Sequence, residues 1–124
     1  MRTGLRTLCF AASLIFLVSG SLAAQSFVSG IEDLPLMPGL TETEEGSLVF
    51  ESATGRFVEV YAIGEMDAAG VSAFYGESLP QLGWQQVSAT LFRREGEILM
   101  IEPLASSGSG GPLTVRFALS PAAN

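Results

Sequence analysis

Regular alternation of apolar and polar residues predicts β-strands in the second half of the chain. Residues 113–119 place every second side chain on one face, namely Leu113, Val115, Phe117 and Leu119. Residues 84–88 and 90–94 are further candidates, and residues 97–102 are apolar on both faces, which is typical of a central strand. Glu95-Gly96 fits a two-residue hairpin turn. This part of the chain is therefore expected to form an antiparallel meander.

Two more strands are predicted upstream. Residues 47–52 and 56–63 are rich in β-branched and aromatic residues, and the Ala-Thr-Gly segment between them fits a short hairpin turn. The second strand has one apolar face, formed by Val58, Val60 and Ala62. Its other face is mixed, as expected of a sheet that is covered on one side only.

A helical period separates the two groups of strands. Four apolar residues fall at i, i+3, i+4 and i+8 on one helical face: Val71, Phe74, Tyr75 and Leu79. Asp67 is a suitable N-cap. Pro80 disfavours helix at the residue before it, so regular helix is expected to end near Leu79, with Gly83 as a left-handed cap.

These elements follow one another as ββαββββ, which predicts an α+β fold with one helix packed on one face of an antiparallel sheet. Four segments are expected along the chain. They are a signal peptide at 1–23, an extended arm at 24–46, a single α+β domain at 47–120 and a disordered tail at 121–124.

The arm holds apolar residues around two prolines, which exclude helix and central strand. The apolar residues are Leu34, Leu36, Met37 and Leu40. Either they lie against the domain, or the segment is exposed and docks on a partner, in which case these four are the candidate partner contacts. The acidic stretch at 41–46 is expected to be a turn or linker.

The N-terminus has the parts of a secretory signal peptide. Arg2 and Arg6 precede an apolar run at 8–18, and small residues follow it. The run is shorter than the roughly 20 residues that span a membrane. Cleavage after Ala23 is favoured and cleavage after Ala24 is the alternative, as is an uncleaved anchor. The chain is therefore expected to be periplasmic or secreted, and to meet the membrane only through this segment.

Composition excludes much common chemistry. The chain has no histidine, its six basic residues are all arginine, and its one cysteine, Cys9, lies in the signal segment. Serine–histidine and cysteine–histidine nucleophiles, zinc sites, Schiff bases and P-loops are thereby excluded from the mature chain. No catalytic residue, cofactor or metal site is assigned, and the domain is expected not to be an enzyme.

The charge is strongly negative. Two of the six arginines precede residue 24 whereas all 13 acids follow it, so removal of the signal leaves four arginines and a formal net charge of −9. Nucleic acids and anionic membranes attract clustered positive charge, so neither is an expected partner. Glu42, Glu44 and Glu45 lack the spacing of a calcium loop and are expected to be solvated.

The stretch FYGESLPQLGW at 74–84 has two interpretations. In the first it is architectural, with the aromatic residues anchoring a helix to the sheet and Trp84 filling the corner. In the second, Tyr61, Tyr75 and Trp84 line a ligand pocket between helix and sheet, since a tyrosine ring can be buried while its hydroxyl stays in a polar site.

PLMPGL at 35–40, FYGESLPQLGW and FRREGE at 92–97 together resemble a family of small exported proteins of Gram-negative bacteria. The resemblance spans most of residues 34–119. It implies a periplasmic location and carries no activity or site residue to this chain.

Two functions are compatible with these features. The first is a non-enzymatic domain that binds another envelope protein or peptide, through the arm at 34–40 and the exposed face of the sheet. The alternative is a carrier of a small apolar or aromatic molecule in the pocket near Tyr61, Tyr75 and Trp84.

Overall fold

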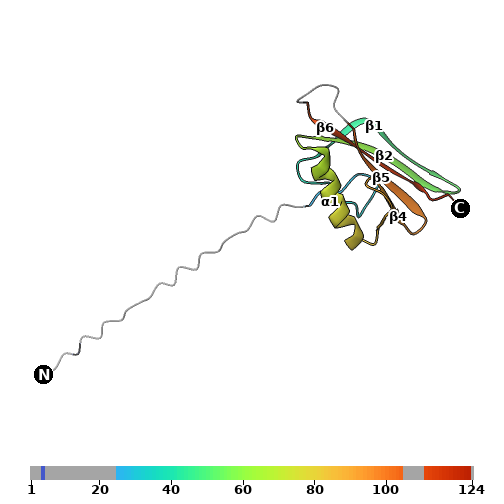
Figure 1. Cartoon of the computed structure of the whole chain (residues 1–124). Coiled ribbons are helices and arrows are strands. Elements are labelled where there is room, and N and C mark those ends of the chain that lie inside the picture. The colour runs from blue at the N-terminus through green and yellow to red at the C-terminus, as the bar shows by residue number, and fades with distance from the viewer. Residues whose placement is uncertain (1–3, 5–24, 105–110, 124) are drawn as a thin grey trace.

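The computed structural model describes residues 4, 25–104 and 111–123, which form one antiparallel sheet with a helix on one face (Figure 1). The elements in chain order are β1 (Thr41–Ser52), β2 (Gly55–Gly64), α1 (Ala68–Gln81), β3 (Gln85–Gln86), β4 (Leu91–Arg94), β5 (Glu97–Leu104) and β6 (Leu113–Pro121). The predicted α+β class and the order ββαββββ are confirmed.

The last strand joins the two halves of the sheet. The spatial order is β1-β2-β6-β5-β4-β3, so β3 to β6 form the expected meander and β6 then pairs with β2. Phe117 lies between Val60 of β2 and Ile101 of β5. The two halves of the sheet are therefore joined only through β6.

One face of the sheet carries the core, and the alternation predicted for β2 and β6 is confirmed. Its buried side chains are Val58, Val60, Ala62, Phe92, Leu99, Ile101, Val115, Phe117 and Leu119. The helix contributes Val71, Tyr75 and Leu79, and Phe74 is partly buried beside them. The ring of Tyr75 meets the ring of Phe117 edge-on, with 5.6 Å between the centroids.

The start of α1 is as predicted, whereas its end is not. The carboxylate of Asp67 accepts from the N–H of Gly70 at 2.7 Å, and Gly83 has the expected positive φ of +88°. The helix nevertheless runs through Pro80 to Gln81. Pro80 lies in the last turn, one residue before the helix ends, so the bend that a proline ring imposes by crowding the carbonyl at i−4 leaves the rest of the helix undisturbed.

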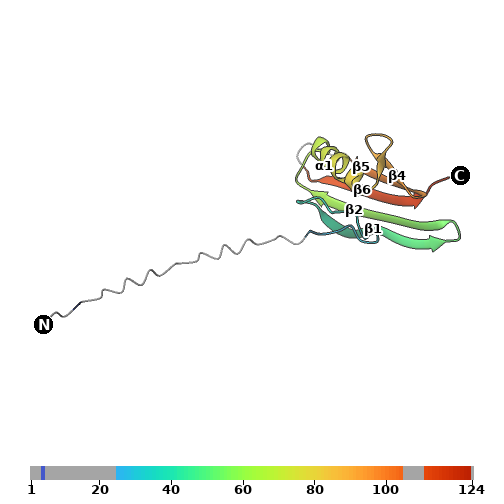
Figure 2. The ribbon, with the colours of Figure 1, turned by 90° about the horizontal axis from the view of Figure 1, so that it is seen from below.

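One helix cannot cover this sheet. Six strands at about 4.8 Å spacing span about 24 Å, whereas a helix with its side chains is about 10 Å wide. The helix packs against β3 and β5 (Figure 2). The rest of the face is covered by the 25–40 segment, whose buried apolar residues are Val28, Ile31, Leu34 and Leu40.

The predicted boundaries of the arm and the tail are therefore corrected. The 25–40 segment belongs to the core, and residues 41–46, predicted as a linker, begin β1. Pro121 ends β6, and the N–H of Ala122 donates to the carbonyl of Gly96 at 2.7 Å, so the chain is held by hydrogen bonding past residue 121. The predicted signal peptide lies, apart from Gly4, outside the described residues.

Replacement of Leu34 tests whether the 25–40 segment is core. Leu34 is fully buried, so we expect Leu34→Ala to lower the free energy of unfolding by about 2–5 kcal/mol in urea denaturation. Leu82→Ala is the matched control, because Leu82 is 39% exposed, and its effect should be clearly smaller. Equal effects would mean that the segment is not part of the core.

Candidate functional site

The four candidate partner contacts of the 25–40 segment do not form an exposed surface. Leu34 and Leu40 are buried, and Leu36 and Met37 are partly buried against the core. The side chains are held inward because backbone bonds within the segment fix its path, among them Val28 N–H to the Leu34 carbonyl at 2.9 Å. The docked interpretation is the one that this structure supports, and Leu34 and Leu40 are not available to a partner.

Tyr75 connects the helix to the 25–40 segment. Its side chain is 1% exposed, and its hydroxyl donates to the carbonyl of Pro35 at 2.8 Å and accepts from the N–H of Met37 at 3.0 Å. Burial raises the pKa of the Tyr75 hydroxyl well above its ordinary value. The hydroxyl thus donates one hydrogen bond to the backbone of the segment and accepts another from it, and no ligand is needed to satisfy it.

Trp84 fills the corner between α1 and β3, as the architectural interpretation predicts. It is buried, and the guanidinium of Arg94 lies 4.3 Å from the centroid of its ring. Its indole N–H has no hydrogen-bond partner among the described residues.

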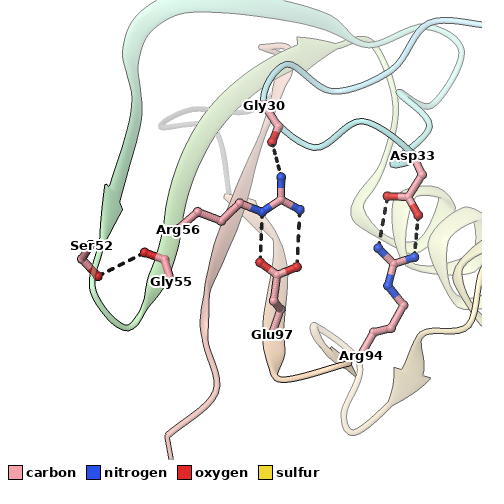
Figure 3. A network of polar contacts seen from close by, with 7 residues as sticks. All are labelled: Gly30, Asp33, Ser52, Gly55, Arg56, Arg94 and Glu97. Carbon is pink, nitrogen blue, oxygen red and sulfur yellow. Dashed lines mark hydrogen bonds and ion pairs between the residues drawn. The ribbon is translucent and has the colours of Figure 1, made fainter.

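Two arginines of the sheet bind the 25–40 segment, Arg56 at Gly30 and Arg94 at Asp33 (Figure 3). Arg94 forms a two-pronged ion pair with Asp33 and donates to the carbonyl of Leu82 at 3.0 Å. Arg56 pairs with Glu97 at 3.0 Å and donates to the carbonyl of Gly30 at 3.1 Å. The hydrogen bond from Arg94 holds the pKa of Asp33 below its ordinary value.

The three residues of the predicted pocket do not line one cavity. Tyr75 and Trp84 are inside the core, whereas Tyr61 points to the opposite face of the sheet, where its hydroxyl donates to Glu59. Alternation along β2 explains this, because Val60 and Ala62 on either side of Tyr61 face the core. A ligand pocket between helix and sheet built from these three residues is therefore excluded by their placement.

The other face of the sheet, which we call the open face, has no described element packed on it (Figure 2). It contains a shallow hollow of about 270 Å³. Its apolar lining comes from four neighbouring strands and includes Leu48, Phe50, Phe57, Ile98, Met100 and Ala118. This is the candidate functional site of the molecule.

The apolar part of the open face reaches the edge of the sheet. Leu48 and Phe50 on β1 are 54% and 45% exposed. The ring of Phe50 stacks on that of Phe57 across the β1–β2 pair, with 4.8 Å between the centroids and 11° between the planes. The stack holds both rings in place at the rim of the hollow.

The other border of the hollow is charged. Arg116 lies between Glu59, at 3.0 Å, and Glu102, at 3.5 Å. The hydrogen bond from Arg116, and then that from Tyr61, lowers the pKa of Glu59. Because the single positive charge of Arg116 is paired with two carboxylates, this border carries an excess negative charge. The charged side chains of this border are paired with one another.

Within residues 4, 25–104 and 111–123 no group of three or more His, Cys, Asp or Glu side chains is placed to hold a metal ion. In the same part of the chain no helix is long and apolar enough to cross a membrane. Comparison with protein-family models, with curated proteins and with solved structures found no match to this chain. The resemblance to small exported proteins stays a prediction, and the site rests on its geometry.

The sequence predicts an exposed sheet face but does not indicate which residues form its apolar hollow. The signals were present, since residues 97–102 are apolar on both faces and Leu48 and Phe50 repeat at a spacing of two. The pattern does not reveal that β2 pairs with β6, and this pairing places Phe57 and Ala118 in the lining of the same hollow.

Removal of the Tyr75 hydroxyl tests its structural role. Tyr75→Phe leaves the Met37 N–H and the buried Pro35 carbonyl without their partner, and we expect a loss of about 1–3 kcal/mol in the free energy of unfolding. Tyr61→Phe removes a hydroxyl that bonds the partly exposed carboxylate of Glu59, which keeps its ion pair with Arg116, and should cost less than about 0.5 kcal/mol in the same urea titration. Equal losses would contradict the assignment.

Acid should weaken the ion pair between Asp33 and Arg94. A carboxyl with a lowered folded-state pKa stabilises the fold above its unfolded pKa, and this contribution disappears as the pH falls through the folded pKa. We expect Asp33→Asn to reduce stability at pH 7 by up to about 1 kcal/mol, since Asp33 is half exposed, and by less near pH 3. Glu77→Gln on the exposed side of α1 is the control, and urea titrations at both pH values should show no such change.

Proposed function

We propose that this protein is an exported, non-enzymatic domain whose open face binds a segment of another protein of the same compartment. The observation that carries the proposal is the apolar hollow on the open face, with Leu48 and Phe50 exposed at its rim. A sheet that is apolar on both faces is typical of strands that are covered on both faces, and only one cover is built into the described chain.

Two features of the open face describe the partner segment. The hollow of about 270 Å³ lies below the roughly 300–1,000 Å³ that is usual for small-molecule pockets, and it is shallow. It suits one or two large apolar side chains better than an enclosed ligand. The acidic border at Glu59 and Glu102 is complementary to arginine or lysine, so we infer a segment with apolar anchors next to basic residues.

The alternative function as a small-molecule carrier has less support. The interior between helix and sheet is occupied by Tyr75, whose hydroxyl is fully bonded, and by Trp84 beneath Arg94.

A non-enzymatic role is in keeping with the lack of histidine and lysine in the chain. Export is supported by the basic, apolar and small-residue pattern of the first 23 residues. Mass spectrometry of the protein from a periplasmic extract should find an N-terminus at Ala24 or Gln25.

Site-specific crosslinking in intact cells tests the binding function. A photoreactive amino acid at Phe57, on the open face, should give a discrete adduct with another protein, while the same group at Glu77 on the exposed side of α1 should not. The crosslinked segment is then identified by mass spectrometry. The proposal requires it to contain large apolar residues next to arginine or lysine.

A synthetic peptide of that segment completes the test. It should bind the purified chain, and Met100→Glu should raise the dissociation constant at least about tenfold, because an apolar contact is replaced by a carboxylate that must lose water. Glu77→Gln should leave the dissociation constant unchanged, and the melting temperatures of both variants must match the wild type. No adduct at Phe57, or equal adducts at both positions, would contradict the proposal.

A further inference from the structure

The two edges of the sheet are very different. One edge is β3, a strand of only two residues that lies beside α1. The other is β1, a strand of 12 residues whose outer side pairs with no described strand. Edge strands present unpaired N–H and C=O groups and are usually kept short or blocked. The β3 edge has that protection, whereas on the β1 edge the cluster of acidic residues and the irregular pairing lie before Leu48 and leave the stretch from Leu48 to Ser52 unblocked.

The composition of β1 increases the contrast. At its centre Leu48, Val49 and Phe50 are 54%, 59% and 45% exposed, and the strand contains neither proline nor lysine. The register with β2 shifts between Thr43 and Leu48, so an irregularity interrupts the acidic half of the strand. From Leu48 to Ser52 the pairing with β2 is regular, and this segment is available to another strand.

We propose that two copies of this chain pair through β1, antiparallel, about a two-fold axis at Val49. The proposal is independent of partner binding at the open face. The partner at the β1 edge is a second copy of the chain because the sequence of β1 is complementary to itself in one antiparallel register.

Alternation along β1 limits the registers. Leu48 and Phe50 point to the open face, because they pair with Glu59 and Phe57 on β2, whereas Val49 and Glu51 point to the covered side. In a continuous antiparallel sheet, residues that lie opposite each other share a face. With the axis at Val49, Leu48 meets Phe50 of the second copy, Val49 meets Val49, and Glu51 meets Ser47.

The neighbouring registers are worse, since like charges directly opposite one another are destabilising. An axis at Leu48 places Glu45 opposite Glu51, and an axis at Glu51 places Glu51 opposite itself. An axis at Phe50 avoids charge repulsion but sets Val49 against Glu51. The axis at Val49 alone among these pairs apolar residues on both faces and places no carboxylate directly opposite another.

The assembly would be closed. A two-fold axis uses both long edges and leaves only the two short β3 edges at the outside, which prevents growth into a fibre. The apolar rims at Leu48 and Phe50 of the two copies would then meet and join their open faces into one surface. Both copies are acidic, but their mutual repulsion is screened over about 8 Å at physiological salt, and the centre of the interface carries no charge.

Single cysteines test both the pairing and its register, with Cys9→Ser as the background so that the chain carries one thiol. Under mild oxidation Val49→Cys should form a disulfide-linked dimer, because opposite Cα atoms lie about 4.5–5.5 Å apart, within disulfide range. Ser47→Cys and Glu51→Cys are exposed controls on the same face. In this register each lies about 14 Å from its own counterpart, and neither should crosslink.

Charge exchange at the axis provides a second readout without oxidation. The chain expressed from its full-length sequence should be a dimer by light scattering, and Val49→Lys and Val49→Glu should each be folded monomers, since Val49 is largely exposed. Mixing the two variants should restore a dimer that contains one of each. A monomeric wild type, no recovery on mixing, or equal crosslinking at all three cysteine positions would overturn the proposal. Crosslinking from Phe57 to another protein would stand or fall separately.

Discussion

A single 14-residue helix cannot shield one face of a six-stranded sheet, and the rest of the structure follows from that constraint. The helix covers the side of the sheet at β3 to β5, so the side at β1 and β2 needs a second cover. The 25–40 segment supplies it with Val28, Ile31, Leu34 and Leu40. Its prolines prevent it from becoming a helix or a central strand. It therefore covers the sheet as an irregular loop whose polar backbone has to be satisfied locally.

That backbone is bonded partly within the segment, as from the Val28 N–H to the Leu34 carbonyl, and side chains from distant elements hold the segment at three further places. The hydroxyl of Tyr75 on the helix serves Pro35 and Met37, Arg56 on β2 serves Gly30, and Arg94 on β4 binds the side chain of Asp33. Helix, sheet and segment are thus joined by directional contacts as well as by apolar packing. An irregular segment inside a core is stable only when its polar groups are paired in this way, so the segment behaves as architecture and not as a recognition arm.

Covering one face so completely leaves the other to interact with solvent or partners. The open face combines an apolar hollow with an acidic border, and the β1 edge continues its apolar rim through Leu48 and Phe50. The two surfaces share these residues but are chemically distinct. The hollow offers side-chain contacts from four strands, whereas the edge offers backbone hydrogen bonds along one strand.

Most of the elements are predictable from local patterns, since the alternation in β2 and β6, the helical period around Tyr75, the cap at Asp67 and the turn at Glu95-Gly96 all act within a few residues. The predicted end of the helix near Leu79 was wrong, because a helix tolerates proline in its last turn, where little helix remains to be bent. The local pattern does not decide whether Leu34 and Leu40 are buried or exposed, and it predicts a linker at residues 41–46, where β1 begins. Only the tertiary structure decided these, because the packing of the 25–40 segment, the pairing of β6 with β2, and the separation of Tyr61 from Tyr75 depend on contacts between residues far apart in the chain.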